Sequence, residues 1–242
     1  MRTNIKEQRK EFILDSVKLI ECFQTYQGEG PDSGKRMLLL RFKYCDQHCS
    51  FCDTKVKMRI SKEGHHTIPE LQVQLQQNRS GLMITGGEPT FKPHYDETVT
   101  LLKDLKYNVA NVETNGYDLE KLLLEESLFN RPIKFIYSPK IFGSFDTEEA
   151  IKLTHSILSN PKVYIKIPYW EDEYVDHYCD WLTKEMDKRM LSEHCDFDNK
   201  VWLMPLGDTF EAQKENSGVV MDACEKYSFN FSGRTHIMYN FI

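Results

Sequence analysis

Short apolar or β-branched runs alternate along the chain with longer segments in which apolar residues follow helical spacing. The first pattern is typical of buried strands and the second of helices that cover them. The predicted strands are Val17–Phe23, Met37–Phe42, Leu82–Thr85, Val109–Glu113, Ile133–Tyr137, Val163–Ile167 and Val201–Met204. The predicted crossover helices are Pro69–Asn78, Tyr95–Lys106, Leu119–Leu128, Thr147–Leu158, Tyr174–Met190 and Phe210–Tyr227. This alternation predicts an α/β fold with a mostly parallel sheet.

The number of strand–helix units sets the expected architecture. About six such units predict a partial, open barrel, and 242 residues suit one domain of this kind. We therefore expect residues 1–242 to form a single domain, with residues 1–16 as an N-terminal extension that precedes the first strand. The polar stretch from Lys55 to Thr67 is predicted to be a loop. In barrels, reactive groups gather at the carboxyl ends of the strands.

Charge and hydropathy narrow the range of partners. Charged residues make up 28% of the chain and the net charge is −6, so there is no general basic surface for nucleic acid. No apolar run has the length of a signal peptide core or a membrane span. The sequence thus predicts a cytoplasmic protein with a small-molecule substrate, without nucleic acid or membrane partners.

Cysteine usage is concentrated in one place. Of seven cysteines, three fall within the eight positions from Cys45 to Cys52. An odd count with such crowding argues against the disulfide framework of a secreted protein. The others are expected to be free thiols in or near the core: Cys22, Cys179, Cys195 and Cys224.

The spacing of Cys45, Cys49 and Cys52 indicates a metal centre directly after a predicted strand. Thiolates bind iron–sulfur clusters, and three of them leave one iron of a four-iron cluster open for another ligand. Zinc is the alternative, with His48 as the fourth ligand, but His48 lies inside the first gap and is poorly free to converge with the thiols. A non-catalytic zinc or electron-transfer module therefore remains an alternative to an enzyme.

A second motif, Thr85-Gly-Gly-Glu-Pro89, ends the next predicted strand. Together with the cysteine loop it resembles the radical S-adenosylmethionine superfamily. The resemblance implies a [4Fe–4S] cluster whose open iron binds S-adenosylmethionine, and reductive cleavage that yields a 5′-deoxyadenosyl radical. Gly86 and Gly87 lack side chains, so a ligand can approach their backbone.

A narrower resemblance rests on residues that flank this loop. Phe23-Gln-Thr-Tyr-Gln-Gly-Glu-Gly30, Arg41 before the cysteines and Thr54 after them are similar to the 7-carboxy-7-deazaguanine synthase family. The resemblance implies radical ring contraction of 6-carboxy-5,6,7,8-tetrahydropterin to 7-carboxy-7-deazaguanine, with loss of ammonia, on the route to queuosine-type bases. It also implies a homodimer that receives electrons from an external donor.

The same resemblance assigns residues. A guanidinium forms a planar fork suited to a carboxylate, so Arg41 is expected to bind the substrate carboxylate. Thr54 is expected to bind Mg²⁺, because a hydroxyl oxygen suits this hard cation. The other expected substrate contacts are Tyr26, Gln27, Gly28, Glu29, Thr85 and the carboxylate of Ile242, near which His236 helps to shape the pocket. The expected contacts of S-adenosylmethionine are Phe51, Cys52, Asp53, Gly87, Ser138, Pro139 and Lys140.

Another radical enzyme is the nearest alternative function. An activase that installs a glycyl radical on a partner protein shares the cysteine spacing. The segment from Gln27 to Gly30, together with Arg41, argues against it.

Overall fold

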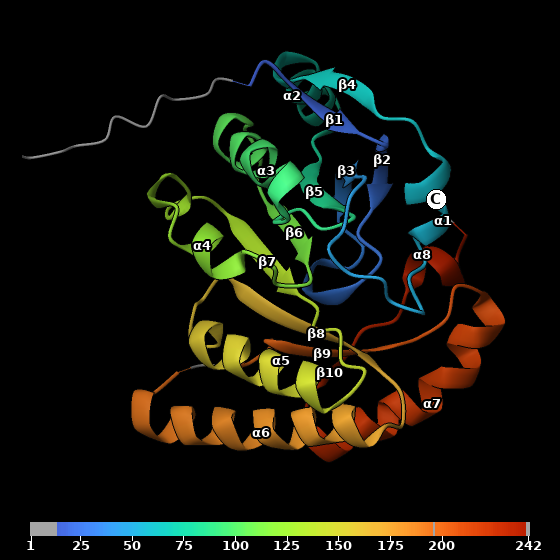
Figure 1. Cartoon of the computed structure of the whole chain (residues 1–242), viewed down its shortest axis with the longest axis vertical. Coiled ribbons are helices and arrows are strands. Elements are labelled where there is room, and N and C mark those ends of the chain that lie inside the picture. The colour runs from blue at the N-terminus through green and yellow to red at the C-terminus, as the bar shows by residue number, and fades with distance from the viewer. Residues whose placement is uncertain (1–13, 196, 241–242) are drawn as a thin grey trace, which may run out of the picture.

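A computed structural model of the protein describes residues 14–195 and 197–240, which form a curved sheet with helices along its outer side (Figure 1). The strands are β1 (Ser16–Leu19), β2 (Glu21–Tyr26), β3 (Arg36–Phe42), β4 (Gly64–Thr67), β5 (Gly81–Gly86), β6 (Ala110–Thr114), β7 (Ile133–Tyr137), β8 (Val163–Tyr169), β9 (Val201–Pro205) and β10 (Asn230–Phe231). The α-helices are α1 (Lys55–Ile60), α2 (Ile68–Asn78), α3 (Lys92–Asp104), α4 (Leu119–Leu123), α5 (Ser144–Ile157), α6 (Glu173–Glu193), α7 (Phe210–Tyr227) and α8 (Thr235–Met238). Two 3₁₀ turns are η1 (Gly30–Asp32) and η2 (Glu126–Leu128).

The main sheet has eight strands in the order β10-β9-β8-β7-β6-β5-β3-β2. All neighbouring strands run parallel except β2 and β3, which are antiparallel. Within the described ranges β2 and β10 each have one strand neighbour, so the sheet does not close. The predicted α/β fold with an open, mostly parallel sheet is confirmed. In Figure 1, α2 to α7 follow the outer side of the sheet, whereas α1 and α8 lie near each other on another side.

Two local predictions are wrong. The predicted strand Val17–Phe23 is two strands, because the chain changes partner around Ile20: β1 pairs with β4 in a separate two-stranded sheet, and β2 pairs with β3. The predicted loop from Lys55 to Thr67 contains α1 and β4. Elements of six and four residues are too short for a periodic pattern to distinguish them from a loop.

The main sheet is apolar on the face that the helices cover. Along β3, for example, Leu38, Leu40 and Phe42 are completely buried in the main hydrophobic core. The alternate residues of β3 point to the opposite face, because successive side chains of a strand alternate. Of these, Leu39 belongs to a small separate cluster and Arg41 faces a pocket.

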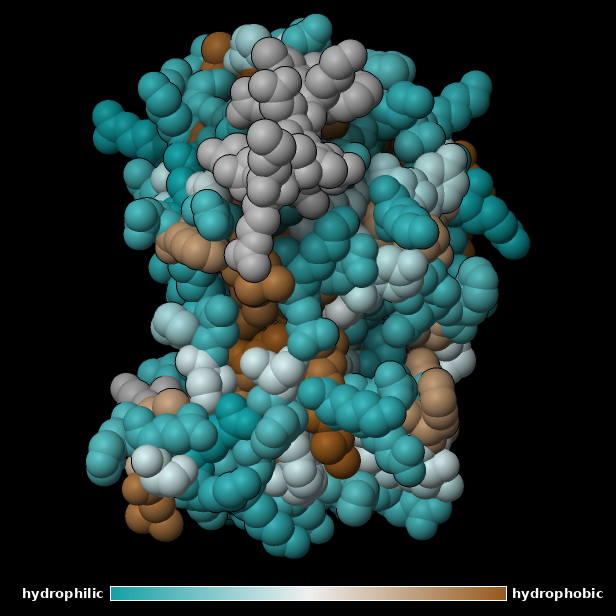
Figure 2. Space-filling model, turned by 60° about the vertical axis from the view of Figure 1, so that its left-hand side comes forward, coloured by the Kyte–Doolittle hydropathy of each residue, from teal (hydrophilic) through white to brown (hydrophobic). Residues whose placement is uncertain are grey.

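One face of the molecule, drawn in Figure 2, is mostly hydrophilic and is interrupted by a strip of hydrophobic residues. Among the helices described, none is long and apolar enough to cross a membrane.

All seven cysteines are free thiols, as the sequence predicted for the four outside the loop. Of these four, Cys179 and Cys224 are buried, while Cys22 and Cys195 are partly exposed.

Candidate active site

A pocket of about 400 Å³ lies on the face of the main sheet opposite the helix-covered core, towards the carboxyl ends of the parallel strands. Its wall combines the β2–η1 turn, the cysteine loop, the strand ends and the segment that contains α8. The pocket brings together nearly all residues that the sequence nominated: Tyr26, Gln27, Gly28, Glu29, Arg41, Cys45, Cys49, Phe51, Cys52, Asp53, Thr54, Thr85, Gly87, Ser138 and Lys140. Pro139 is buried and does not line it, and Ile242 lies outside the described residues.

The three loop cysteines face this pocket, and each sulfur contacts its own loop. Cys45 Sγ accepts the Gln47 amide at 3.4 Å, and Cys52 Sγ lies 3.4 Å from Thr54 Oγ1. Among the described residues, no three His, Cys, Asp or Glu side chains are already arranged around one point as metal ligands. Burial raises the pKa of Cys45 to about 12 and also raises that of Cys49. A cation bound there would favour the thiolates, so the donor set suits an iron–sulfur cluster.

The glycines at the end of β5, Gly86 and Gly87, allow the chain to pack against the segment that leads into the cysteine loop. A Cβ on Gly87 would collide with the backbone carbonyl of Tyr44, and Gly86 has φ +130°, which favours glycine. The next residue, Glu88, is buried and accepts hydrogen bonds from Thr114 Oγ1 at 2.6 Å and from the Asn115 amide at 2.6 Å. Burial raises the pKa of Glu88. Asn115 in turn donates to Asp46 Oδ1 in the loop at 2.8 Å, so the Gly-Gly-Glu segment helps to fix the loop.

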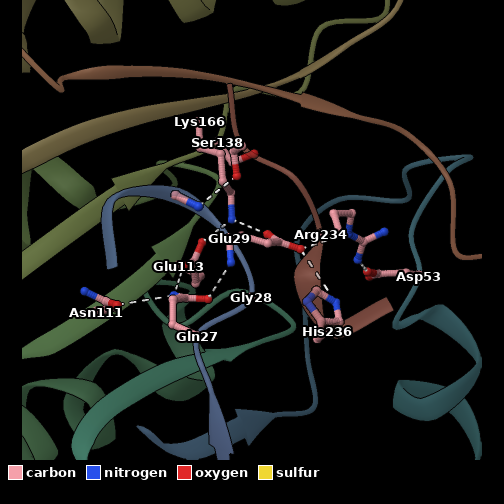
Figure 3. A network of polar contacts seen from close by, with 12 residues as sticks. Gln27, Gly28, Glu29, Asp53, Asn111, Glu113, Ser138, Lys166, Arg234 and His236 are labelled. Carbon is pink, nitrogen blue, oxygen red and sulfur yellow. Dashed lines mark hydrogen bonds and ion pairs between the residues drawn. The ribbon is translucent and has the colours of Figure 1, made fainter. Parts of the chain in front are cut away.

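A buried ionic network forms the floor of the pocket (Figure 3). Lys166 of β8 donates to Glu29 at 2.5 Å and to Glu113 of β6 at 2.6 Å. Gln27 donates from Nε2 to Glu113 at 3.0 Å and to Asn111 at 3.2 Å. Burial raises the pKa of Glu29, but attraction by Lys166 and Arg234 outweighs it and holds this pKa well below the ordinary value. Glu29 is therefore a carboxylate at neutral pH.

Residues after β10 complete this network from the other side. Arg234 donates from Nε to Glu29 at 2.8 Å, from Nη1 to the Gly207 carbonyl at 2.7 Å and from Nη2 to Asp53. His236 packs against Gly28, where any side chain would collide with its ring. Burial lowers the pKa of His236, which favours the neutral imidazole.

Arg41 is held by the strand next to it. Glu21 of β2 is its register partner, and Glu21 Oε2 accepts from Arg41 Nε at 2.5 Å. Glu21 Oε1 accepts from Lys57 of α1 at 2.9 Å. Burial raises the pKa of Glu21, but hydrogen bonds from Lys57 and Arg41 lower it overall. Within the described structure the terminal nitrogens of Arg41 have no protein acceptor, and the residue lines the pocket.

Lys140 is a cation without a carboxylate partner among the described residues. Its Nζ donates to Ser138 Oγ at 2.6 Å, and burial lowers its pKa. Attraction to a thiolate at Cys49 raises the pKa of Lys140 but does not outweigh burial. A cation that lines a pocket and has no ion-pair partner suits an anionic group of a ligand.

Three residues of the polar network at the pocket floor were not predicted from the sequence. Lys166 interrupts the apolar run of β8, and a lysine inside a buried strand was a usable signal. Asn111 occupies a similar position in β6, where it is 1% exposed. Arg234 carried no such signal, because its partners Glu29 and Asp53 lie 205 and 181 residues away in the chain.

Comparison with known proteins agrees with this geometry. Residues 27–160 match a family described as a 4Fe-4S single cluster domain. The chain is 33% identical to a 7-carboxy-7-deazaguanine synthase of Hyperthermus butylicus, over 96% of each chain. It is 29% identical to the same enzyme of Thermoplasma acidophilum, over 69% of this chain and 76% of the relative. The fold is similar to that of QueE from Escherichia coli, with a TM-score of 0.54, 19% identity and coverage of 90% of this chain and 93% of the other.

Proposed function

The chain belongs to the 7-carboxy-7-deazaguanine synthase family, and from this premise we propose how its pocket works. The reaction is the radical ring contraction of 6-carboxy-5,6,7,8-tetrahydropterin to 7-carboxy-7-deazaguanine with loss of ammonia, a step in 7-deazaguanine biosynthesis. One observation carries the assignment of the site. A single pocket brings the cysteine loop, the Gly-Gly-Glu segment, the Gln27–Glu29 turn and Arg41 together. The zinc and activase alternatives have no comparable support.

Cys45, Cys49 and Cys52 would hold the [4Fe–4S] cluster, since all three line the pocket next to Gly87 and Lys140. When bound, the cluster and S-adenosylmethionine supply the 5′-deoxyadenosyl radical that starts the reaction. Lys140 would bind the carboxylate of S-adenosylmethionine, with Ser138 as its hydrogen-bonding neighbour. Phe51 and Asp53, on either side of Cys52, would complete that binding surface.

The pterin would lie across the floor network. Its fused ring presents both donor and acceptor edges, which need matching polar groups. Glu29 offers a carboxylate and Gln27 an amide, and Gly28 lines the pocket between them. Tyr26 and Thr85 border the same space, and Arg41 would bind the substrate carboxylate with its terminal nitrogens. The C-terminal carboxylate of Ile242 stays a predicted contact, outside the described residues.

The metal near the substrate carboxylate would be Mg²⁺, bound by Thr54. Mg²⁺ keeps several waters and takes oxygens from its substrate, so one protein hydroxyl is sufficient. The Thr54 hydroxyl lines the pocket 3.4 Å from Cys52 Sγ, between the cluster ligands and α1. Replacement of Thr54 by Val is expected to weaken the dependence of the rate on Mg²⁺ while the iron content stays unchanged.

An external electron donor would dock on α1, next to the cysteine loop. From Lys55 to Lys62 the chain has four basic residues and no acidic one, although its net charge is −6. Lys55, Arg59 and Lys62 are exposed, and the described residues offer them no ion pair. Charge complementarity therefore favours an acidic one-electron carrier protein. Reversal of these three charges should slow turnover with reduced flavodoxin but not with dithionite; equal slowing with both would contradict this docking site.

The proposal also includes one domain over residues 1–242, a homodimer and a cytoplasmic location. Mass photometry or sedimentation of the reconstituted protein tests the dimer. A monomer would contradict it.

Anaerobic reconstitution tests the function itself. The protein is loaded with iron and sulfide, then incubated with the carboxypterin, S-adenosylmethionine, Mg²⁺ and dithionite. Formation of 7-carboxy-7-deazaguanine is the expected result. Deoxyadenosine alone, without this product, would indicate another substrate, and a protein that binds zinc in place of iron would exclude the radical reaction.

A further inference from the structure

The cysteine loop is connected to the substrate side of the pocket by a first ionic bridge, centred on Arg234 (Figure 3). Arg234 contacts Asp53, the residue after Cys52, with one nitrogen. With another it contacts Glu29 at 2.8 Å, and the Arg234 side chain is only 9% exposed. One buried guanidinium thus ties the loop to the turn that follows β2.

A second bridge connects α1 to the strand pair β2–β3. Lys57 of α1 contacts Glu21 Oε1 at 2.9 Å, and Glu21 Oε2 contacts Arg41 at 2.5 Å. The Glu21 side chain is 20% exposed and that of Arg41 is 12% exposed. Here one carboxylate ties the helix after the loop to the arginine that faces the pocket.

The two bridges share one design. Each has three charged residues of alternating sign, and the third of them borders the proposed substrate site. The first bridge is Asp53–Arg234–Glu29 and the second is Lys57–Glu21–Arg41. The outer residues Asp53 and Lys57 are 41% and 42% exposed, but the inner ion pairs are mostly buried and weakly screened. Removal of a central residue leaves charges without partners. A displacement of residues 45–60 therefore changes the surroundings of Glu29 and Arg41, and substrate bound to them favours one loop arrangement.

We propose that Arg234 and Glu21 are positioning residues that couple the cysteine loop energetically to the bound substrate. This inference rests on the proposed function, because it takes Glu29 and Arg41 as substrate contacts. Coupling between two sites is reciprocal and amounts to about 5- to 150-fold in an equilibrium constant. Loss of either bridge should allow S-adenosylmethionine cleavage that is not followed by product formation.

A purely structural role is the competing explanation, and the chain contains a matched example of it. Arg189 of α6 donates to Glu185 at 2.7 Å, to Ser159 at 2.9 Å and to the His155 carbonyl at 2.8 Å. Its side chain is 9% exposed, like that of Arg234, and it does not line the pocket. Arg189→Lys is therefore the control for Arg234→Lys.

In the lysine variants the positive charge remains, but a single ammonium group replaces the guanidinium nitrogens that contact several partners at once. For Arg234→Lys we expect the ratio of deoxyadenosine to deazaguanine product to rise at least several-fold at saturating pterin. Pterin should slow backbone hydrogen exchange in residues 45–60 of the wild type, and this protection should be lost in Arg234→Lys. For Arg189→Lys both readouts should equal those of the wild type, even if thermal stability falls. An Arg234→Lys variant with only a stability change would overturn the inference.

The second bridge is tested at its outer end, with Lys57→Gln. The control is Lys152→Gln, which removes an exposed ion pair with Glu149 at 2.5 Å, remote from the pocket. Lys57→Gln should raise the same ratio and Lys152→Gln should not; equal ratios in both variants would contradict this bridge. Product formation by the wild type is measured alongside. Its absence would refute the proposed function, whereas product without a change in ratio in any variant would refute only the coupling.

Discussion

Adjacent residues of β3, Leu40 and Arg41, belong to two different surfaces of the main sheet. Leu40 is completely buried under the helices, in a core of aliphatic and aromatic side chains. Arg41 points to the other face, where the pocket contains Lys166, Glu29 and Glu113. The two faces of the same strands thus serve different purposes: one contributes burial of apolar area, and the other holds polar groups in fixed positions.

The pocket face is preorganised rather than merely polar. In the described part of the chain, the buried side-chain atoms without a hydrogen-bond partner are Gln24 Oε1, Ser80 Oγ and Gln213 Oε1, and none of these residues lines the pocket. Polar groups that are already held by their neighbours need little reorganisation when a charged substrate binds. The comparison therefore predicts that changes on the helix-covered face act mainly on stability, and that changes on the pocket face act mainly on binding and reaction.

The largest effect is expected from the cysteine loop. Cys49→Ala removes one of three thiols that line the pocket, so the cluster should not assemble and product formation should fall to the blank rate. Iron content, the visible absorption of the cluster and product are measured together. The apolar face is untouched, and urea unfolding of the metal-free variant should match that of the metal-free wild type. Wild-type product formation by the variant would refute the cluster assignment.

On the helix-covered face, Leu40→Ala should act on stability. A completely buried leucine leaves a cavity, and such substitutions cost about 2–5 kcal/mol. Urea unfolding measures the loss, and the Kd for the carboxypterin should stay within about twofold of the wild type. A large change in Kd with unchanged stability would contradict the division between the two faces.

One residue further along, Arg41→Gln should act on binding. The variant loses the charge-assisted contact with the substrate carboxylate, which is worth about 1.5–3 kcal/mol, or roughly 10- to 150-fold in Kd. Isothermal titration with the carboxypterin measures this. A matched pterin without the carboxyl group should bind both proteins equally. If Arg41→Gln prefers the carboxypterin over the pterin without a carboxyl group as strongly as the wild type does, another residue binds the carboxylate.

The smallest effect concerns pH and the pocket floor. The pKa of Glu29 in the folded protein lies well below 4.5, so below that pH the unfolded state binds more protons than the folded state. Glu29 therefore contributes stability that is present above pH 4.5 and is lost as the pH falls through its folded-state pKa. The difference in unfolding free energy between wild type and Glu29→Gln should be constant at neutral pH and shrink in acid. A difference that grows in acid would mean that Glu29 is not ion-paired.

Much of the fold could be predicted because buried parallel strands form continuous apolar runs. β7 and α7 have the predicted boundaries, Ile133–Tyr137 and Phe210–Tyr227. Short elements could not be predicted, because α1 and β4 are stabilised by tertiary partners rather than by their own periodicity. The break at Ile20 depends likewise on which strand each half pairs with.

The candidate site was nominated from motifs, and the structure places these residues around one pocket. The motifs did not include the residues that hold the motif side chains in place. Arg234 and Glu29 meet across 205 positions of sequence, and no local pattern encodes such a pair. Glu21 became meaningful only once the register placed it opposite Arg41. The nomination of Pro139 followed from its neighbours in sequence, and the structure shows it buried away from the pocket wall.

The most direct test of the account uses carboxypterin with deuterium at C6, from which the 5′-deoxyadenosyl radical would remove hydrogen and later return it to regenerate S-adenosylmethionine. The reconstituted protein is given this substrate, unlabelled S-adenosylmethionine, Mg²⁺ and dithionite, and the products are analysed by mass spectrometry. The account predicts 7-carboxy-7-deazaguanine together with deuterium in the recovered S-adenosylmethionine. Unlabelled S-adenosylmethionine and deoxyadenosine, with the pterin recovered intact, would contradict it.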